Sequence, residues 1–334
     1  MQNISILGTQ PIGLSLALSI KNSSIKTNRI VAYSQNSSSF NEIKSLSIFD
    51  DISKDINKTL QGSNLVIIDS PLIEIPSLFD AIARNNSNKD LIILNLNGSQ
   101  SRCMAWANEI LTEDINYIGL RPILKSEIPA INDVSDLLLE DIDFCIMPSP
   151  SADSKSVKNI IQLVEKIRSK PYFLDTHEHD SYFVAMDKIS DVISAAYINA
   201  TSTKSSWMEM YKSAGVEFDS QSKNATKDPI INEAECLTLS DPLIYWIDEI
   251  IVSLNKFKET LKSENDDLLN YLVESWEQKA KWESDAISQT VNSFHLPSAA
   301  EAMGNTILGN KLSKRLTGNQ DPDKRQNWKY PKQG

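Results

Sequence analysis

The stretch Ile4–Gly13, which reads ISILGTQPIG, joins a short apolar run to a turn that holds two glycines. The apolar run predicts a buried strand, and Pro11 suits the first turn of a helix, where its missing N–H matters little. Gly8 and Gly13 have the spacing of the first and third glycines in the dinucleotide-binding turn GxGxxG. We therefore expect a strand, a tight turn and a helix, as at the start of a nucleotide-binding α/β domain.

Gln10 stands where that turn has its second glycine. This glycine normally lets the backbone approach the pyrophosphate. A glutamine side chain would crowd the ligand there, although its amide could donate to a phosphate oxygen. An ordinary strand, turn and helix would show the same pattern, so the turn by itself leaves both a cofactor site and a structural role open.

Outward from this stretch, residues 1–175 alternate short apolar runs with amphipathic segments. Apolar runs without polar alternation are typical of strands buried on both faces of a parallel sheet. The alternation predicts a doubly wound, mainly parallel α/β domain of the Rossmann type over residues 1–175. The strands that we expect are Ile4–Leu7, Arg29–Tyr33, Leu65–Asp69, Leu91–Leu94, Tyr117–Leu120, Phe144–Met147 and Tyr172–Leu174. The helices that we expect between them are Ile12–Ile20, Ile73–Ala83, Ser101–Leu111 and Ser154–Arg168.

From Asp175 onward the pattern is helical only. Asp175 and Glu178 have the spacing of a capping box and predict a long helix that ends near Ser206. We expect an all-helical dimerisation domain over residues 176–300 and a polar, basic tail over residues 301–334. Within these parts we expect helices at Asp241–Lys262 and Asp266–Ser284 and a polar loop at Asp219–Asn232.

The composition narrows the class of partner. The chain has 334 residues, 41% of them hydrophobic and 23% charged, and a net charge of −11. This length suits about two domains, and an acidic surface repels phosphate backbones, so we expect no nucleic-acid partner. Three cysteines without a CxxC pair indicate neither a disulfide framework nor a metal site. Since the sequence shows no signal-peptide pattern and no long apolar run, we expect a cytoplasmic protein without a membrane span.

Two further strand ends lie where a cofactor would bind. Ser34 follows the second strand at the place where an acidic residue would bind the ribose of NAD. Its short hydroxyl leaves room for a 2′-phosphate, which favours NADP slightly over NAD, although no arginine follows to neutralise that phosphate. Ser70 and Pro71 follow the strand at Leu65–Asp69, in a loop expected to lie over the cofactor. An ordinary polar loop and a strand-ending proline are the structural alternatives.

Taken together, these motifs resemble those of the prephenate/arogenate dehydrogenase family. The resemblance covers roughly residues 1–285, and its motifs are specific through their order and spacing. Residues 4–17 resemble the family's GLGLIGGSLA, 64–71 resemble DLVVLAVP, 95–101 fall at TDVGSVK, 119–122 fall at GGHPMAGSE, 175–180 resemble DPEEHD, and 240–243 resemble SGDPELW. The resemblance implies an NAD(P)-dependent oxidoreductase that converts prephenate or arogenate by oxidative decarboxylation in tyrosine biosynthesis. It also implies a small dicarboxylate substrate and a homodimer formed through the helical domain.

The same resemblance provides the candidate site residues. Arg121 stands where the family has its catalytic histidine; a guanidinium stays protonated and is no general base, but it can bind a carboxylate. The alternatives are an internal ion pair with an acidic residue such as Asp187 or Asp191, which would fill the site, and an arginine on the surface. Ser99 falls at the serine that orients the substrate hydroxyl. His179 matches the family motif and is a candidate catalytic residue, with helix capping as the alternative. Lys188, in the segment that replaces the family's SHLPH, is a second candidate for binding a substrate carboxylate.

Two interpretations of these departures remain open. One is an active dehydrogenase. The substrate loses CO2 readily and aromatisation drives the reaction, so a missing base need not abolish it. The other is a non-catalytic or repurposed dimeric relative with a binding or regulatory role. Gln10, Ser34, Arg121 and the segment Asp187–Asp191 each replace a chemically special residue, which favours the second interpretation. The resemblance to the family as a whole favours the first, and an active dehydrogenase is therefore our prediction, with the non-catalytic relative as the alternative.

Overall fold

The computed structural model describes residues 3–35, 37–85, 88, 90–262 and 267–284. Contacts divide the chain into two compact units, residues 1–247 and residues 248–334. The first unit holds the sheet and all helices up to the start of α12, so the predicted domain boundary near residue 175 stays a prediction. The expected tail over residues 301–334 lies outside the described residues.

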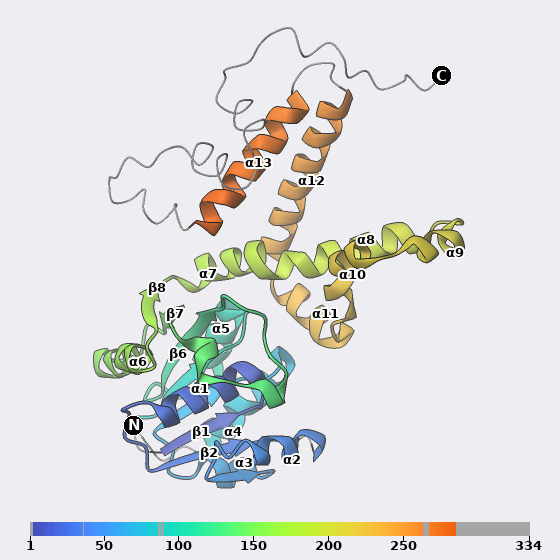
Figure 1. Cartoon of the computed structure of the whole chain (residues 1–334). Helices are drawn as coiled ribbons and strands as arrows, with labels where there is room; N and C mark the ends of the chain where they lie inside the picture. Colours follow the sequence, from blue (N-terminus) through green and yellow to red (C-terminus); the bar gives the residue numbers. More distant parts are fainter. Residues whose placement is uncertain (1–2, 36, 86–87, 89, 263–266, 285–334) are drawn as a thin grey trace. The chain divides into compact units, whose positions relative to one another are not determined.

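The first unit is built on one eight-stranded sheet with the order β3-β2-β1-β4-β5-β6-β7-β8 (Figure 1). Every neighbouring pair is parallel except β6 and β7, which confirms the predicted doubly wound, mainly parallel fold. The strands are β1 (Asn3–Leu7), β2 (Arg29–Tyr33), β3 (Asp51–Ser53), β4 (Leu65–Ile68), β5 (Ile92–Asn95), β6 (Asn116–Ile123), β7 (Asp143–Pro148) and β8 (Lys170–Phe173).

Alternate side chains of each central strand enter two apolar clusters, one on each face of the sheet. In β4, Leu65 and Ile67 belong to the cluster that packs on α1 and α6, whereas Val66 and Ile68 belong to the cluster that packs on α4 and α5. Burial on both faces explains why these strands have no polar alternation. The flanking helices are α1 (Pro11–Asn22), α2 (Ser37–Ser45), α3 (Ile56–Leu60), α4 (Ile75–Asn85), α5 (Gln100–Ile110) and α6 (Ser154–Lys166).

The helical part begins as predicted at Asp175, whose carboxylate accepts the backbone N–H of His177 at 2.8 Å. The expected single helix is α7 (Thr176–Phe183), a π-helical segment (Val184–Lys188) and α8 (Ile189–Ser202), which follow one another without a break (Figure 1). A π-helical turn inside an α-helix is rare and frequently lies at a functional site. The first unit then continues through α9 (Trp207–Met210), α10 (Val216–Ser222), α11 (Pro229–Thr238) and the start of α12 (Ser240–Lys262). Short 3-10 turns cover Leu72–Glu74, Ile131–Asp133, Asp136–Leu139, Tyr211–Ser213 and Lys223–Thr226.

The predicted loop at Asp219–Asn232 is wrong, because its residues form the end of α10, a 3-10 turn and the start of α11. The carboxylate of Asp228 accepts the N–H groups of Ile230 and Ile231, and Pro229 occupies the first helical position. An aspartate followed by a proline is a regular helix start. Here the polar composition of the stretch obscured that signal.

The second unit holds the rest of α12 and α13 (Asp267–Glu283), within one or two residues of the predicted helices. The rings of Phe257 and Tyr271 pack edge to face with centroids 5.4 Å apart, and the hydroxyl groups of Tyr271 and Ser253 are 2.7 Å apart. Among the helices of the described ranges, none combines the length and the apolar character that crossing a bilayer requires.

Candidate functional site

The carboxyl ends of β1 and β4 meet so closely that only a glycine fits between them. Gly8 follows β1 with φ +97°, and a Cβ added to it would lie 2.1 Å from the carbonyl oxygen of Asp69. Ser70 is buried beside it, and its hydroxyl donates to the carbonyl of Leu7 at 3.2 Å. The first glycine of the turn is therefore required by the backbone geometry, and Ser70 serves the contact between the two strands.

The third glycine of the turn, Gly13, contacts a carboxylate from the next strand. Its N–H donates to Oδ2 of Asp69 at 2.5 Å, and a Cβ on Gly13 would lie 2.7 Å from the Cβ of Asp69. Burial raises the pKa of Asp69 to about 6, against the opposing effects of the Gly13 hydrogen bond and the positive charge of Arg121. An acidic group thus lies at the amino end of α1, where a Rossmann domain holds the pyrophosphate of a dinucleotide.

The other residues of this turn and of the neighbouring strand ends provide no group that offsets the negative charge of Asp69. Gln10 is exposed, has an extended backbone at the N-cap of α1 and makes no side-chain bond to the helix. Pro11 has no N–H to offer a phosphate. Ser34 is buried and its N–H donates to the carbonyl of Ser53, and Pro71 begins the 3-10 turn after β4. The turn keeps the glycine geometry of a dinucleotide site, but its residues do not fit the diphosphate.

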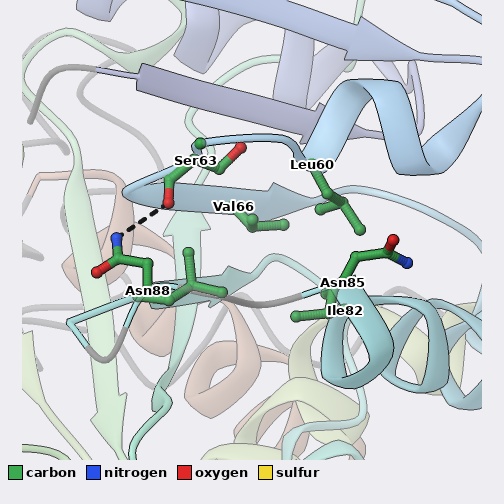
Figure 2. A pocket seen from close by; sticks show the side chains of 8 residues that line it. Leu60, Ser63, Val66, Ile82, Asn85 and Asn88 are labelled. Atoms are coloured by element: carbon green, nitrogen blue, oxygen red, sulfur yellow. Dashed lines mark hydrogen bonds between the residues drawn. The ribbon is translucent and has the colours of Figure 1, made fainter.

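At the opposite edge of the sheet, near the amino ends of β4 and β5, lies a cavity of only about 10 Å³ (Figure 2). Its wall includes Leu60, Val66 and Ile82, and Asn88 donates to the carbonyl of Ser63 at 3.1 Å on one side. This volume holds about one water molecule. A small-molecule ligand needs the space at the carboxyl edge instead.

A cleft of about 1190 Å³ opens at the carboxyl edge, beside the end of β6. It brings together three of the residues selected from the sequence, Arg121, His179 and Lys188, and one residue of α1, Ile12. Phe183, Asp187, Tyr172 and Tyr182 contribute to the same wall. We call this space the Arg121 cleft.

Arg121 lies near the end of β6 and faces this cleft. Its Nη2 donates to Oδ2 of Asp187 in the π-helical segment at 3.0 Å, and its Cζ lies 4.3 Å from the centroid of the Phe183 ring. The Arg121 side chain is 18% exposed and that of Asp187 is 59% exposed. The structure thus forms an ion pair whose cationic partner is largely buried and whose anionic partner is in water.

His179 is buried next to Asp180, and the two residues have different roles. The Asp180 carboxylate accepts the backbone N–H groups of Gln100 at 2.8 Å and Ser101 at 2.9 Å, so it caps α5 from the neighbouring helix. Nδ1 of His179 lies 3.0 Å from the same carboxylate. Because a carboxylate only accepts, Nδ1 must carry the proton and Nε2 is left as the basic nitrogen. Capping is done here by Asp175 and Asp180 rather than by His179.

Ser99 lies at the N-cap of α5 but does not cap that helix. Its side chain is 1% exposed, and Oγ has no hydrogen-bond partner among the described residues. The ring of Phe183 presses on the neighbouring Gly98, where an added Cβ would lie 2.5 Å from a ring carbon. Ser99 thus follows directly after the contact between Gly98 and Phe183 of α7, and it does not line the Arg121 cleft.

Lys188 lines the Arg121 cleft, but its ammonium group is held in a buried ionic network. Its Nζ donates to Asp191 at 3.1 Å, to Glu235 at 2.6 Å and to the side chain of Asn232. Burial would lower the pKa of Lys188, but hydrogen bonds and charge from Glu235 and Asp191 raise it above its ordinary value. Lys227 adds a second cation to Asp191 at 2.7 Å. The network connects α8 to α11 and leaves Lys188 fully engaged.

From the sequence, Asp69 was placed with Ser70 and Pro71 in a loop near the cofactor but was given no role of its own, and Phe183 was missed. Asp69 was recognisable as an acidic residue at the end of the apolar run LVII, at a position where the similar family motif has alanine. Nothing in the local sequence distinguishes Phe183, whose contacts are with Gly98, in the loop after β5, and with Arg121 of β6.

The comparisons with known proteins agree with this architecture. No family model matches the chain. The prephenate dehydrogenase of Aquifex aeolicus, solved with hydroxyphenyl propionate and NAD+, superimposes with a TM-score of 0.76 at 21% identity, over 84% of this chain and 98% of that chain. The arogenate dehydrogenase of Synechocystis gives 0.68 at 15% identity over 84% and 100%. A putative prephenate dehydrogenase of Corynebacterium glutamicum gives 0.69 at 17% over 85% and 89%.

These likenesses define the class of fold: an α/β domain of the Rossmann type followed by a helical region. More particularly, the chain has the fold of the prephenate and arogenate dehydrogenases over nearly the full length of those proteins. At these identities the likeness concerns the fold.

Proposed function

We propose that this chain binds a small organic carboxylate in the Arg121 cleft and is a repurposed relative of the prephenate and arogenate dehydrogenases. The observation that carries the proposal is the placement of Arg121. A largely buried guanidinium faces a cleft of ligand size, and among the described residues the carboxylate that it is hydrogen-bonded to is the exposed one of Asp187. A guanidinium can bind a carboxylate through two parallel hydrogen bonds. The ring of Phe183 packs against the face of the Arg121 guanidinium.

The walls of the cleft narrow the class of ligand. Ile12, Tyr172 and Phe183 provide apolar and aromatic surface near the cation. A ligand with a ring or a short apolar body and one or two carboxylates fits this chemistry, because its body leaves water while its charge meets Arg121. Prephenate and arogenate belong to that class and are the first ligands to test.

A second candidate function is an NAD(P)-dependent prephenate or arogenate dehydrogenase, and the pairing of His179 with Asp180 favours it. Nδ1 of His179 is held at 3.0 Å by Asp180, and the residue lines the Arg121 cleft. An imidazole oriented in this way can accept a substrate proton at Nε2. Arg121 would then bind the substrate carboxylate. The poor fit of the α1 turn to a diphosphate is the reason that we rank this candidate second.

One set of measurements tests both candidates. Calorimetric titration with prephenate and arogenate should detect binding to the wild type and none to Arg121→Ala. Arg168→Ala is the matched control, since it removes an exposed arginine paired with Glu140. Turnover is followed by reduction of NAD+ or NADP+ in the same samples. Binding without turnover supports the first candidate, and turnover that His179→Gln abolishes supports the second. Absence of binding to the wild type contradicts both.

A further inference from the structure

We propose that Asp69 is an internal anion that occupies the amino end of α1 in place of a ligand phosphate, so that this turn rejects dinucleotides. The inference goes beyond the proposed function. It concerns the α1 turn alone and holds whether or not the Arg121 cleft binds a carboxylate.

The first step is the supply of N–H groups at the start of α1. The amino end of a helix attracts one anion because its first N–H groups have no partner within the helix. In α1 the bond from the N–H of Leu14 to the carbonyl of Gln10, at 3.1 Å, is the first within the helix, so the free positions are those before Leu14. Of these, Pro11 has no N–H, and the N–H of Gly13 donates to Asp69 at 2.5 Å. Two of the positions that would bind a phosphate therefore offer no free donor.

The second step is that Asp69 reaches this position only because residue 13 is a glycine. A Cβ on Gly13 would lie 2.7 Å from the Cβ of Asp69 and 2.8 Å from its Oδ2. The space that Gly13 provides for close packing of helix and strand is thus taken by a carboxylate from the end of β4. At Gly8 the backbone of Asp69 is closer still, since an added Cβ would lie 2.1 Å from its carbonyl oxygen. Both retained glycines of the turn accommodate Asp69.

The third step is charge. A pKa of about 6 leaves the carboxylate mostly ionised at neutral pH, next to the place where a diphosphate would put two more negative charges. Arg121 is the cation whose charge acts on Asp69, and it is already paired with Asp187 at 3.0 Å. Like charges at such short range oppose each other strongly where water is partly excluded. Dinucleotide binding must therefore neutralise or displace Asp69.

The experiment is a calorimetric titration of the full chain with NAD+ and, separately, with ADP-ribose, which has the same diphosphate without nicotinamide. Asp69→Ala removes the carboxylate, and Asp69→Asn keeps its size and an acceptor oxygen while it removes the charge. Asp80→Asn is the matched control, because Asp80 is an exposed carboxylate on α4. Circular dichroism and thermal melts verify that each variant folds.

We expect the wild type and Asp80→Asn to bind both ligands very weakly, and Asp69→Ala to bind them at least about tenfold more tightly, with a smaller gain for Asp69→Asn. If Asp69→Ala fails to fold, the isosteric Asp69→Asn decides alone. Micromolar binding of NAD+ by the wild type overturns the proposal. Folded Asp69 variants that bind no better than the wild type overturn it as well. Neither result bears on carboxylate binding at Arg121, which is measured without nucleotide.

Discussion

The guanidinium of Arg121 donates to the carboxylate of Asp187 at 3.0 Å, although Asp187 is mostly exposed and Arg121 is not. The two partners therefore differ in their exposure to water. If a ligand carboxylate replaces Asp187, the displaced aspartate returns to water and the buried cation stays paired. Loss of Arg121 would instead leave only Lys188 and Lys227 as cations among the described lining residues, and both are already paired with Asp191.

From this asymmetry we predict that Asp187→Asn tightens the binding of a carboxylate ligand. A half-exposed ion pair is worth about 0.2–1 kcal/mol, so removal of the competing charge should lower the Kd of prephenate by up to about fivefold. Calorimetric titration measures the change. Glu140→Gln, which removes the acceptor of the surface pair with Arg168, should leave the Kd unchanged. A weaker Kd for Asp187→Asn would show that Asp187 orients Arg121 for the ligand rather than competing with it.

The backbone at Gly8 provides a stability test of the turn. Alanine at this position would adopt φ +97° and put its Cβ 2.1 Å from a carbonyl oxygen, so Gly8→Ala should destabilise the protein by more than about 2 kcal/mol. Gly215→Ala is the control, since a Cβ there meets nothing within 4 Å, and its effect should stay within about 1 kcal/mol. Urea unfolding followed by circular dichroism compares the two. Equal effects would mean that the β1–β4 contact is looser than described.

Lys188 should be a structural residue whose removal is costly. Breaking a buried ionic network by removing one partner costs about 3–5 kcal/mol, so Lys188→Met should destabilise the protein by that amount. Lys223→Met, which removes an exposed lysine paired with Glu127, should have little effect. If Lys188→Met is stable but no longer binds carboxylates, Lys188 is a ligand residue and the network is secondary.

The pH dependence of that network has a definite sign. Burial opposes the charge on Lys188, but Glu235 and Asp191 outweigh it and raise the pKa above the ordinary 10.5. A pKa that is higher in the folded state gives stability that is complete below the unfolded value and is lost only as the pH rises through the folded one. The difference in unfolding free energy between the wild type and Lys188→Met should therefore be constant from neutral to mildly alkaline pH and shrink above about pH 10.5.

Local patterns were sufficient for most of the sheet and failed where contacts are distant. The central strands were predicted correctly because burial on both faces of the sheet requires apolar side chains. The strand β3 was not predicted, because its three residues, DIS, are not an apolar run. The place of Arg121 near the end of a strand followed from the motif order, and an ion pair with Asp187 or Asp191 was one of its two predicted roles, which the pair with Asp187 confirms. The π-helical conformation of the segment that holds Asp187 did not follow from the sequence. Asp69 and Gly13 are 56 residues apart, and Lys188 and Glu235 are 47 apart, so no local pattern links them.

Dimerisation through the helical part remains a prediction, and the structure refines its basis. Val184 and Ile189, two apolar residues of the long helical segment after Asp175, pack inside the monomer, whereas Ile193, Tyr197 and Leu237 are exposed. Exposed apolar side chains of this size favour a partner surface. We expect a dimer by light scattering at micromolar concentration and a shift toward monomer in Ile193→Glu. Leu137→Glu, at an exposed leucine of the α/β part, is the control. A monodisperse wild-type monomer would contradict the prediction.

The last prediction combines the two positions that depart from the dehydrogenase pattern. Arg121 stands at the position where the similar family motif has histidine, and Asp69 occupies the amino end of α1. Arg121→His alone should not turn over prephenate, because the dinucleotide is still rejected. With Asp69→Ala added, NAD+ binds and the imidazole can accept the hydroxyl proton, so oxidation followed by NADH absorbance should become measurable. Because Arg121→His also removes the guanidinium that binds the carboxylate, the assay uses prephenate at concentrations far above the wild-type Kd. General base catalysis contributes about 10²–10⁴-fold, so Arg121→Gln with Asp69→Ala, which binds NAD+ but has no base at this position, should be slower by that factor. If Asp69→Ala alone is as active as the double variant, the base is elsewhere in the cleft, and His179, held by Asp180, is then the group to replace.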